Sequence, residues 1–243
     1  PIAYYNEVTN ERYDKAVEKY GHLENFNLLK ADFFNLKIRN INNSKKVFTI
    51  IRNNPPYTWM EWKGLNIRAE DLFFIKNAEY NVEEGIHIFE LPMYQLLEQK
   101  TLLKKIMFRY EDVNILKFPE EEFKKFNQVV VIGRKKHVDK NDSELAEKWE
   151  EKIMSDNIPY LDKVEKPVIK LTRKAVAKTI PIKLFRDGKV TDLTLTNGFN
   201  AVLDELLEAS VTKYLKVDLE KEKKIPIIEQ TPGHIALDLY SGE

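Results

Sequence analysis

The sequence predicts an α/β protein whose mostly parallel sheet ends in an antiparallel hairpin. Through about residue 136, apolar strand-like runs alternate with amphipathic helical segments, as in a parallel sheet with crossover helices. The runs "VNILKFP" and "NQVVVIGRKK" break this alternation, because only "EEEFKKF" separates them and a full crossover helix would not fit. We therefore predict one α/β domain over residues 1–137, followed by a smaller α+β extension over 138–243.

The individual elements follow from local patterns. The N-terminal part begins with a strand at 2–8 and a helix at 10–21, for which Asn10 is a suitable N-cap and Gly21 a C-terminal stop. Apolar runs and helical spacing then predict strands at 25–34, 45–53 and 85–92, and helices at 69–82 and 94–110. In the extension we expect helices at 143–157 and 199–216, with an extended basic segment at 160–190 between them.

Composition excludes several classes of protein. The 243 residues are 43% hydrophobic and 32% charged, which is typical of a globular protein with a well-charged surface. Lys plus Arg and Asp plus Glu number 39 each, so any surface for a polyanion must be local. There is no cysteine, the four histidines show no ligand spacing, and no apolar run reaches membrane-span length. We expect a cytoplasmic protein with no metal and no membrane contact.

The segment Asn54-Pro55-Pro56-Tyr57 is the strongest chemical signal in the sequence. It directly follows the apolar run "KKVFTII", and two prolines end a strand because they cannot donate to the sheet ladder. The Asn54 amide oxygen and a proline-flanked carbonyl can accept both hydrogens of a planar amine, while Tyr57 can stack on the ring that carries it. The prolines keep these acceptors in place, and this arrangement suits methylation of a weakly nucleophilic amine.

This tetrapeptide, at the end of a strand in such a sheet, resembles motif IV of the S-adenosylmethionine-dependent amino-methyltransferases. That group includes N6-adenine DNA methyltransferases, some RNA guanine-N2 enzymes and some protein glutamine-N5 enzymes. The resemblance implies a Rossmann-like class I methyltransferase sheet and S-adenosylmethionine as the cofactor. It implies catalytic roles for Asn54, Pro55, Pro56 and Tyr57, with Asn54 also close to the cofactor.

Two upstream segments fit the same family. Glu7 ends the strand "AYYNEV" where the family has an acid that binds the cofactor ribose, and "ADFF" places Asp32 and Phe33 where the family holds the cofactor adenine. If that segment is extended, Phe33 and Phe34 point to opposite sides and one of them belongs to the core. The closing strands also match, and the tail "PIIEQTPGHIALDLYSG" resembles that of a little-characterised bacterial and phage family of such proteins.

The glycine-rich cofactor loop of the family has no counterpart in the sequence. No two of the eight glycines are close enough for a G-x-G turn, and the motif order places that loop before Pro1. We therefore expect the chain to be a piece of a longer protein. The alternative is that the protein lacks the loop and binds cofactor poorly.

Nucleic-acid contacts are predicted in two places. Trp59 and Trp62 follow the motif and could stack on a flipped base, although they could equally order their loop by packing. The stretch 166–189 carries eight basic side chains against the single acid Asp187 and could follow a phosphate backbone, or could be a solvated strand edge. The basic residues are Lys166, Lys170, Arg173, Lys174, Lys178, Lys183, Arg186 and Lys189.

These observations lead to one hypothesis and two alternatives. The order of cofactor segment, Asn-Pro-Pro-Tyr motif and basic region resembles that of the γ-group DNA methyltransferases, in which the target-recognition region is C-terminal. This order favours N6-adenine methylation in duplex DNA with base flipping. RNA or a protein glutamine could instead be the acceptor. The third hypothesis is a catalytically silent subunit that uses the methyltransferase fold only for binding.

Overall fold

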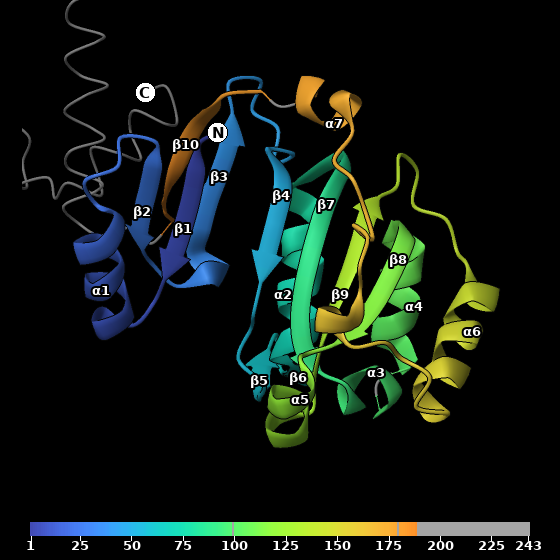
Figure 1. Ribbon diagram of the computed structural model, residues 1–243. Coiled ribbons are helices and arrows are strands. Elements are labelled where there is room, and N and C mark those ends of the chain that lie inside the picture. Colours follow the sequence, from blue (N-terminus) through green and yellow to red (C-terminus); the bar gives the residue numbers. More distant parts are fainter. Residues whose placement is uncertain (99, 179, 189–243) are drawn as a thin grey trace, which may run out of the picture. The chain divides into compact units, whose positions relative to one another are not determined.

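The computed structural model describes residues 1–98, 100–178 and 180–188 (Figure 1). The compact unit that contains them runs from Pro1 to Gly188, so residues 138–188 belong to the same unit as the predicted α/β domain. The helix predicted at 199–216 and the C-terminal tail lie outside the described residues.

The main sheet has four strands in the order β4-β7-β9-β8. β4 is parallel to β7, whereas β9 is antiparallel to both β7 and β8, so the predicted closing hairpin is confirmed. The short connection between β8 and β9 holds helix α5 (Glu120–Phe126), which ends at Asn127 in the left-handed conformation with φ 51°. The sheet strands are β4 (Phe48–Asn53), β7 (Asn81–Pro92), β8 (Tyr110–Lys117) and β9 (Gln128–Lys135).

A second parallel pair precedes this sheet in the chain. Helix α1 (Asn10–Tyr20) connects β1 (Ala3–Glu7) to β2 (Phe26–Lys30), as predicted, although its N-cap is Thr9 rather than Asn10. β1 and β4 run in the same direction in Figure 1, and the rings of Tyr4 and Phe48, near their first residues, lie 5.6 Å apart. The carboxyl ends of β1, β2, β4 and β7 therefore share one edge of the structure, the lower edge in Figure 1.

Several elements were not predicted. The segment after β2 forms a 3₁₀ turn, η1 (Phe33–Asn35), and then strand β3 (Leu36–Asn40), which pairs antiparallel with β10 (Ile182–Asp187). The loop after Tyr57 forms a hairpin of β5 (Trp59–Trp62) and β6 (Leu65–Arg68). β10 lies in the segment 160–190 that was expected to be extended, but η2 (Leu161–Lys163) and α7 (Arg173–Ala177) show that this segment is not extended throughout. The pairing of β3 with β10 joins residues far apart in sequence, which no local pattern indicates.

Helices cover the sheet. The predicted helix over 94–110 corresponds to α3 (Tyr94–Glu98) and α4 (Lys100–Arg109), in which Leu96, Leu102, Leu103, Ile106 and Met107 are buried in the main core. The other helical elements are α2 (Ala69–Tyr80), α6 (Ser143–Met154), η2 (Leu161–Lys163) and α7 (Arg173–Ala177). Within the described residues, no helix is both long and apolar enough to span a membrane.

Candidate active site

The Asn54-Pro55-Pro56-Tyr57 motif leaves the sheet at the carboxyl end of β4. Pro55 is buried, Asn54 and Pro56 are exposed, and Tyr57 is half-buried against the main core. The Tyr57 hydroxyl donates to Asn54 Oδ1 at 2.6 Å and accepts from Nε2 of Gln128, the first residue of β9, at 2.9 Å. The motif is therefore tied to the closing hairpin by its tyrosine.

The environment keeps the Tyr57 phenol protonated. Burial raises the pKa of Tyr57 and the Glu90 carboxylate raises it further, to about 12, although the hydrogen bond from Gln128 acts in the opposite direction. Glu90 is itself buried near the end of β7 and pairs with Arg52 at 2.6 Å. At neutral pH, Tyr57 is consequently a stable hydrogen-bond donor to Asn54.

Glu7 ends β1 at the same edge. Its Oε1 accepts from the backbone N–H of Val8 at 2.8 Å and of Thr9 at 3.0 Å, and from the Thr9 hydroxyl at 3.1 Å. Burial alone would raise the pKa of Glu7, but these hydrogen bonds outweigh it and hold the pKa below its ordinary value. The carboxylate is thus ionised and oriented, and its Oε2 lies 4.0 Å from Arg12.

Asp32 caps the 3₁₀ turn that follows β2. Its Oδ1 accepts from the backbone N–H of Phe34 at 2.9 Å. Because the turn is not extended, Phe33 and Phe34 do not take the opposite sides expected of a strand: their rings meet edge to face at 5.5 Å. Phe33 is the one of the two that packs against a core cluster. Phe33 also stacks on Phe73 of α2 at 4.5 Å, so Asp32 stands next to an aromatic cluster.

Lys76 of α2 lies against the turn that follows Asp32. Its ammonium donates to the backbone carbonyl of Phe33 and lies 4.9 Å from the centre of the Phe33 ring. Burial lowers the pKa of Lys76 to about 8, and the Asp32 carboxylate limits that decrease. A cation therefore lies close to Asp32, the acid that the family resemblance places at the cofactor adenine.

The two tryptophans have different environments. Trp59 is 57% exposed, with the Arg68 guanidinium 5.3 Å from its ring, whereas Trp62 is partly buried and its ring lies 5.1 Å from that of Phe34. The β5–β6 hairpin thus connects the segment after Tyr57 to the Asp32 turn. Trp62 packs within the site, and Trp59 is the ring available at its surface.

The part of the basic stretch around α7 lies elsewhere, whereas β10 ends beside the Asp32 turn, where the backbone N–H of Gly188 donates to the carbonyl of Asn35 at 2.8 Å. Lys178 pairs with Glu83 at 2.6 Å, and Thr172, which caps α7, donates to Glu84. Glu83 and Glu84 belong to the amino-terminal end of β7, opposite the edge that carries Asn54. The structure does not bring Lys170, Arg173, Lys174 and Lys178 together with the motif.

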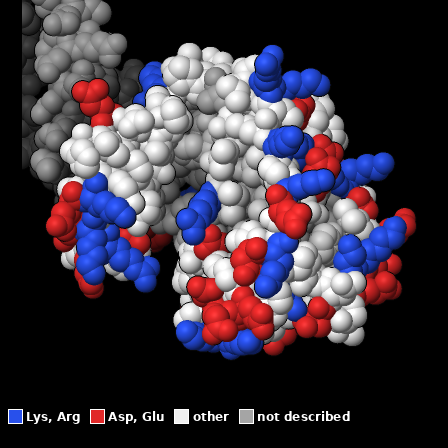
Figure 2. Space-filling model, in the orientation of Figure 1, with Lys and Arg blue, Asp and Glu red and all other residues white. Residues whose placement is uncertain are grey.

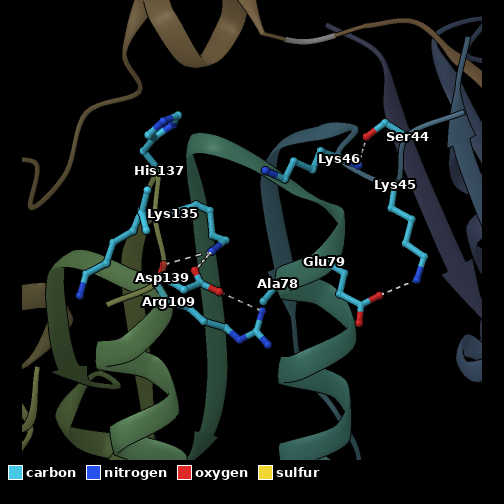
Figure 3. A pocket seen from close by; sticks show the side chains of 11 residues that line it. Ser44, Lys45, Lys46, Ala78, Glu79, Arg109, Lys135, His137 and Asp139 are labelled. Carbon is cyan, nitrogen blue, oxygen red and sulfur yellow. Dashed lines mark hydrogen bonds and ion pairs between the residues drawn. The ribbon is translucent and has the colours of Figure 1, made fainter. Parts of the chain in front are cut away.

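A hollow of about 740 Å³ opens at this opposite edge (Figure 3). It lies between the chain just before β4, the last turns of α2 and α4, and the segment after β9. Its basic side chains already have partners: Lys45 pairs with Glu79, Lys135 with Asp139, and Lys136 donates to the carbonyl of Met107 in α4. These cations stabilise the ends of helices and strands, and the candidate site remains the edge with Asn54.

The carboxyl edge of the strands suits a methyl donor with ribose and adenine groups. Glu7 offers an oriented carboxylate for a ribose diol, and Asp32 offers an acceptor beside the rings of Phe33 and Phe34, which can contact a planar base. Ligands of open α/β sheets bind at the carboxyl ends of the strands. The carboxylates and aromatic rings at this edge therefore fit S-adenosylmethionine.

This fold and this edge define an α/β protein with the features of a methyltransferase. The chain belongs to an uncharacterised methyltransferase family, DUF6094, whose model matches residues 16–173. No curated protein matches the chain significantly.

Two solved structures show similarity to the chain. One is a protein of Listeria monocytogenes assigned to the class I S-adenosylmethionine-dependent methyltransferases, with 16% identity and a TM-score of 0.46 over 63% of this chain and 54% of that one. The chain thus spans about half the length of that protein. The other is a predicted O-methyltransferase of Agrobacterium tumefaciens, with 12% identity and a TM-score of 0.37 over 66% of this chain and 80% of that one.

Sequence reasoning missed three residues of this edge. Gln128, Lys76 and Phe73 reach the site only through tertiary contacts. Lys76 and Phe73 occupy one side of α2, and their spacing of three residues was the available signal. Nothing in the sequence around Gln128 indicates a contact with Tyr57.

Proposed function

We propose that this protein transfers a methyl group from S-adenosylmethionine to the exocyclic N6 amine of adenine in DNA. The single observation that carries the proposal is the position of Asn54-Pro55-Pro56-Tyr57 at the carboxyl end of β4, on the edge shared by Glu7 and Asp32. Membership in a methyltransferase family supports the reaction class.

Each residue of the candidate site has a separate role in this proposal. Glu7 binds the ribose of the donor and Asp32 its adenine, beside Phe33. Asn54 Oδ1 and the Pro55 carbonyl accept the two hydrogens of the acceptor amine, so that the nitrogen lone pair is directed at the methyl group. S-Adenosylmethionine supplies an electrophilic methyl on a sulfonium sulfur.

The exposed ring of Trp59 near the motif has a role in giving the enzyme access to N6. The amine of a base inside a duplex cannot reach a buried methyl group, so the base must leave the stack. Trp59 is exposed two residues after Tyr57, and its ring is available to stack on an extruded base or on its neighbour.

A second acceptor class is favoured by one observation. The described basic residues Arg173, Lys174 and Lys178 lie at the edge opposite Asn54, and near Gln128 helix α5 begins with Glu120, Glu121 and Glu122. Figure 2 shows acidic and basic side chains interspersed on the visible face, without a continuous basic surface. Because RNA carries the same phosphate charge as DNA, this observation favours a protein glutamine as the alternative acceptor. RNA and a silent binding subunit are the remaining alternatives.

Methyl-group transfer from tritiated S-adenosylmethionine into separate DNA, RNA and protein fractions distinguishes these alternatives. We expect label in DNA with the wild-type protein and none with Asn54→Ala, whose cofactor affinity by calorimetry stays close to the wild-type value. Asn157→Ala, an exposed change after α6, serves as the matched control. Label only in protein or only in RNA would show that DNA is not the acceptor. Undetectable cofactor binding by the full-length wild-type protein would leave the silent binding subunit as the remaining hypothesis.

A further inference from the structure

Three side chains form a directed hydrogen-bond chain at the motif. Nε2 of Gln128 carries only hydrogens to donate, so the Tyr57 oxygen is the acceptor of that 2.9 Å bond. The single phenol proton is then directed to Asn54 Oδ1, 2.6 Å away. The hydrogen-bond chain runs from Gln128 through Tyr57 to Asn54, and the bond from Gln128 sets the direction in which the Tyr57 hydroxyl donates.

Gln128 is the most firmly held member of this chain. It opens β9, where it pairs with Pro92 of β7, and its carbonyl accepts from the backbone N–H of Phe118 at 3.1 Å. The residue before it, Asn127, is the left-handed cap of α5, and its carbonyl accepts from Met93 at 2.8 Å. A side chain on so well-fixed a backbone can serve as a reference point for a more mobile partner.

Asn54, by contrast, is exposed and lies outside the sheet ladder. Without a partner its carboxamide could rotate, and the amine would meet the NH₂ group as often as the oxygen. The bond from Tyr57 uses one lone pair of Oδ1 and leaves the second for the acceptor amine. Orientation of Asn54 is thus set by Tyr57, and that of the Tyr57 proton by Gln128.

We propose that Gln128 is a positioning residue for methyl transfer, which orients the Asn54 oxygen through the hydroxyl of Tyr57. This inference rests on the proposed function of the Asn54 motif, but it concerns a residue outside that motif. Gln128 does not touch the reacting atoms, and it acts on the rate of transfer rather than on binding of the methyl donor.

Two substitutions at Gln128 separate orientation from packing. Gln128→Leu removes the donor at similar volume. Gln128→Glu introduces a carboxylate that, when ionised, can only accept, so it captures the Tyr57 proton and takes it away from Asn54. We expect kcat to fall about 10-fold in Gln128→Leu, the loss typical of one hydrogen bond, and further in Gln128→Glu. In Gln128→Glu, kcat should recover as pH falls and the new carboxyl is protonated; in Gln128→Leu it should not.

The Tyr57→Phe background tests whether the effect passes through the hydroxyl. If it does, Gln128→Leu and Gln128→Glu have no further effect on kcat once the hydroxyl is gone, because coupled residues are non-additive. Lys125→Gln, an exposed change on α5, is the control and should leave kcat unchanged. Additive losses, or equal losses in Gln128→Leu and Gln128→Glu at every pH, would overturn the proposal.

A measurement without turnover keeps this test apart from the proposed function. In protein with ¹⁵N-labelled asparagine, the side-chain amide resonances of Asn54 are assigned from their loss in Asn54→Ala. We expect Gln128→Leu alone to shift these resonances relative to the wild-type protein. Added to Tyr57→Phe, the same substitution should leave them unchanged. If the wild-type protein methylates no fraction, the proposed function fails while this result still decides the hydrogen-bond chain; unshifted Asn54 resonances in Gln128→Leu would refute the chain itself.

Discussion

The ammonium group of Lys76 donates a hydrogen bond to the backbone carbonyl of Phe33 and lies over the ring of the same residue. This single lysine therefore fixes the turn that presents Asp32, through both the backbone and the side chain of its neighbour. Holding a cation in this half-buried position is unfavourable, and the pKa of Lys76 falls to about 8 as a result.

Stability should depend on pH through this lysine. The folded-state pKa of Lys76 is about 8 and the ordinary value is 10.5, so between these values the unfolded chain binds more protons. The wild-type protein should therefore gain stability relative to Lys76→Met as pH rises from about 8 to 10.5. Urea unfolding of both proteins across this range measures the difference, and a constant difference would show that Lys76 titrates normally.

Glu83 should stabilise the opposite edge of the sheet in a pH-dependent way. Hydrogen bonds from Lys178, Lys46 and His137 lower the pKa of Glu83 to about 2. This stabilisation is complete above the ordinary pKa of 4.5 and is lost as pH falls toward 2. We expect Glu83→Gln to cost about 1–2 kcal/mol at pH 7, given the partial exposure of its partners, and to flatten the acid limb of the stability curve. The result is read from chemical unfolding between pH 2 and 7; identical acid limbs would contradict it.

The two tryptophans should differ on substitution. Trp62→Ala removes a ring packed 5.1 Å from Phe34 and should reduce the free energy of unfolding by about 1–3 kcal/mol. Trp59→Ala removes an exposed ring and should change stability by less than about 0.5 kcal/mol, while raising KM for the acceptor. Thermal unfolding and steady-state kinetics on both variants make the comparison. A large loss of stability in Trp59→Ala, with KM unchanged, would assign its role to packing.

The basic residues of α7 can be tested for phosphate contacts by salt dependence. If Arg173 and Lys174 contact a nucleic-acid backbone, replacing either by Gln should weaken binding to all sequences and reduce the slope of log K against log salt by about 1. Fluorescence anisotropy with labelled DNA measures both quantities, and Lys148→Gln on α6 is the matched control. An unchanged slope would place any nucleic-acid surface outside α7.

The sequence by itself determined the fold class, the closing hairpin and the place of the Asn54 motif at the end of a strand. These features depend on local causes: the period of apolar residues, the length of a connection, and prolines that cannot join a sheet ladder. The position of Glu7 at the end of β1 followed in the same way.

Only the tertiary structure decided what surrounds these residues. β3 pairs with β10, Trp62 reaches the Asp32 turn, and Gln128 binds Tyr57, each across a separation in sequence that no local pattern records. Such contacts form when chain segments that bury apolar surface are packed together, because burial has no preference for neighbours in sequence. The motif was therefore visible in the sequence, whereas the partners that orient its asparagine became visible only in the fold.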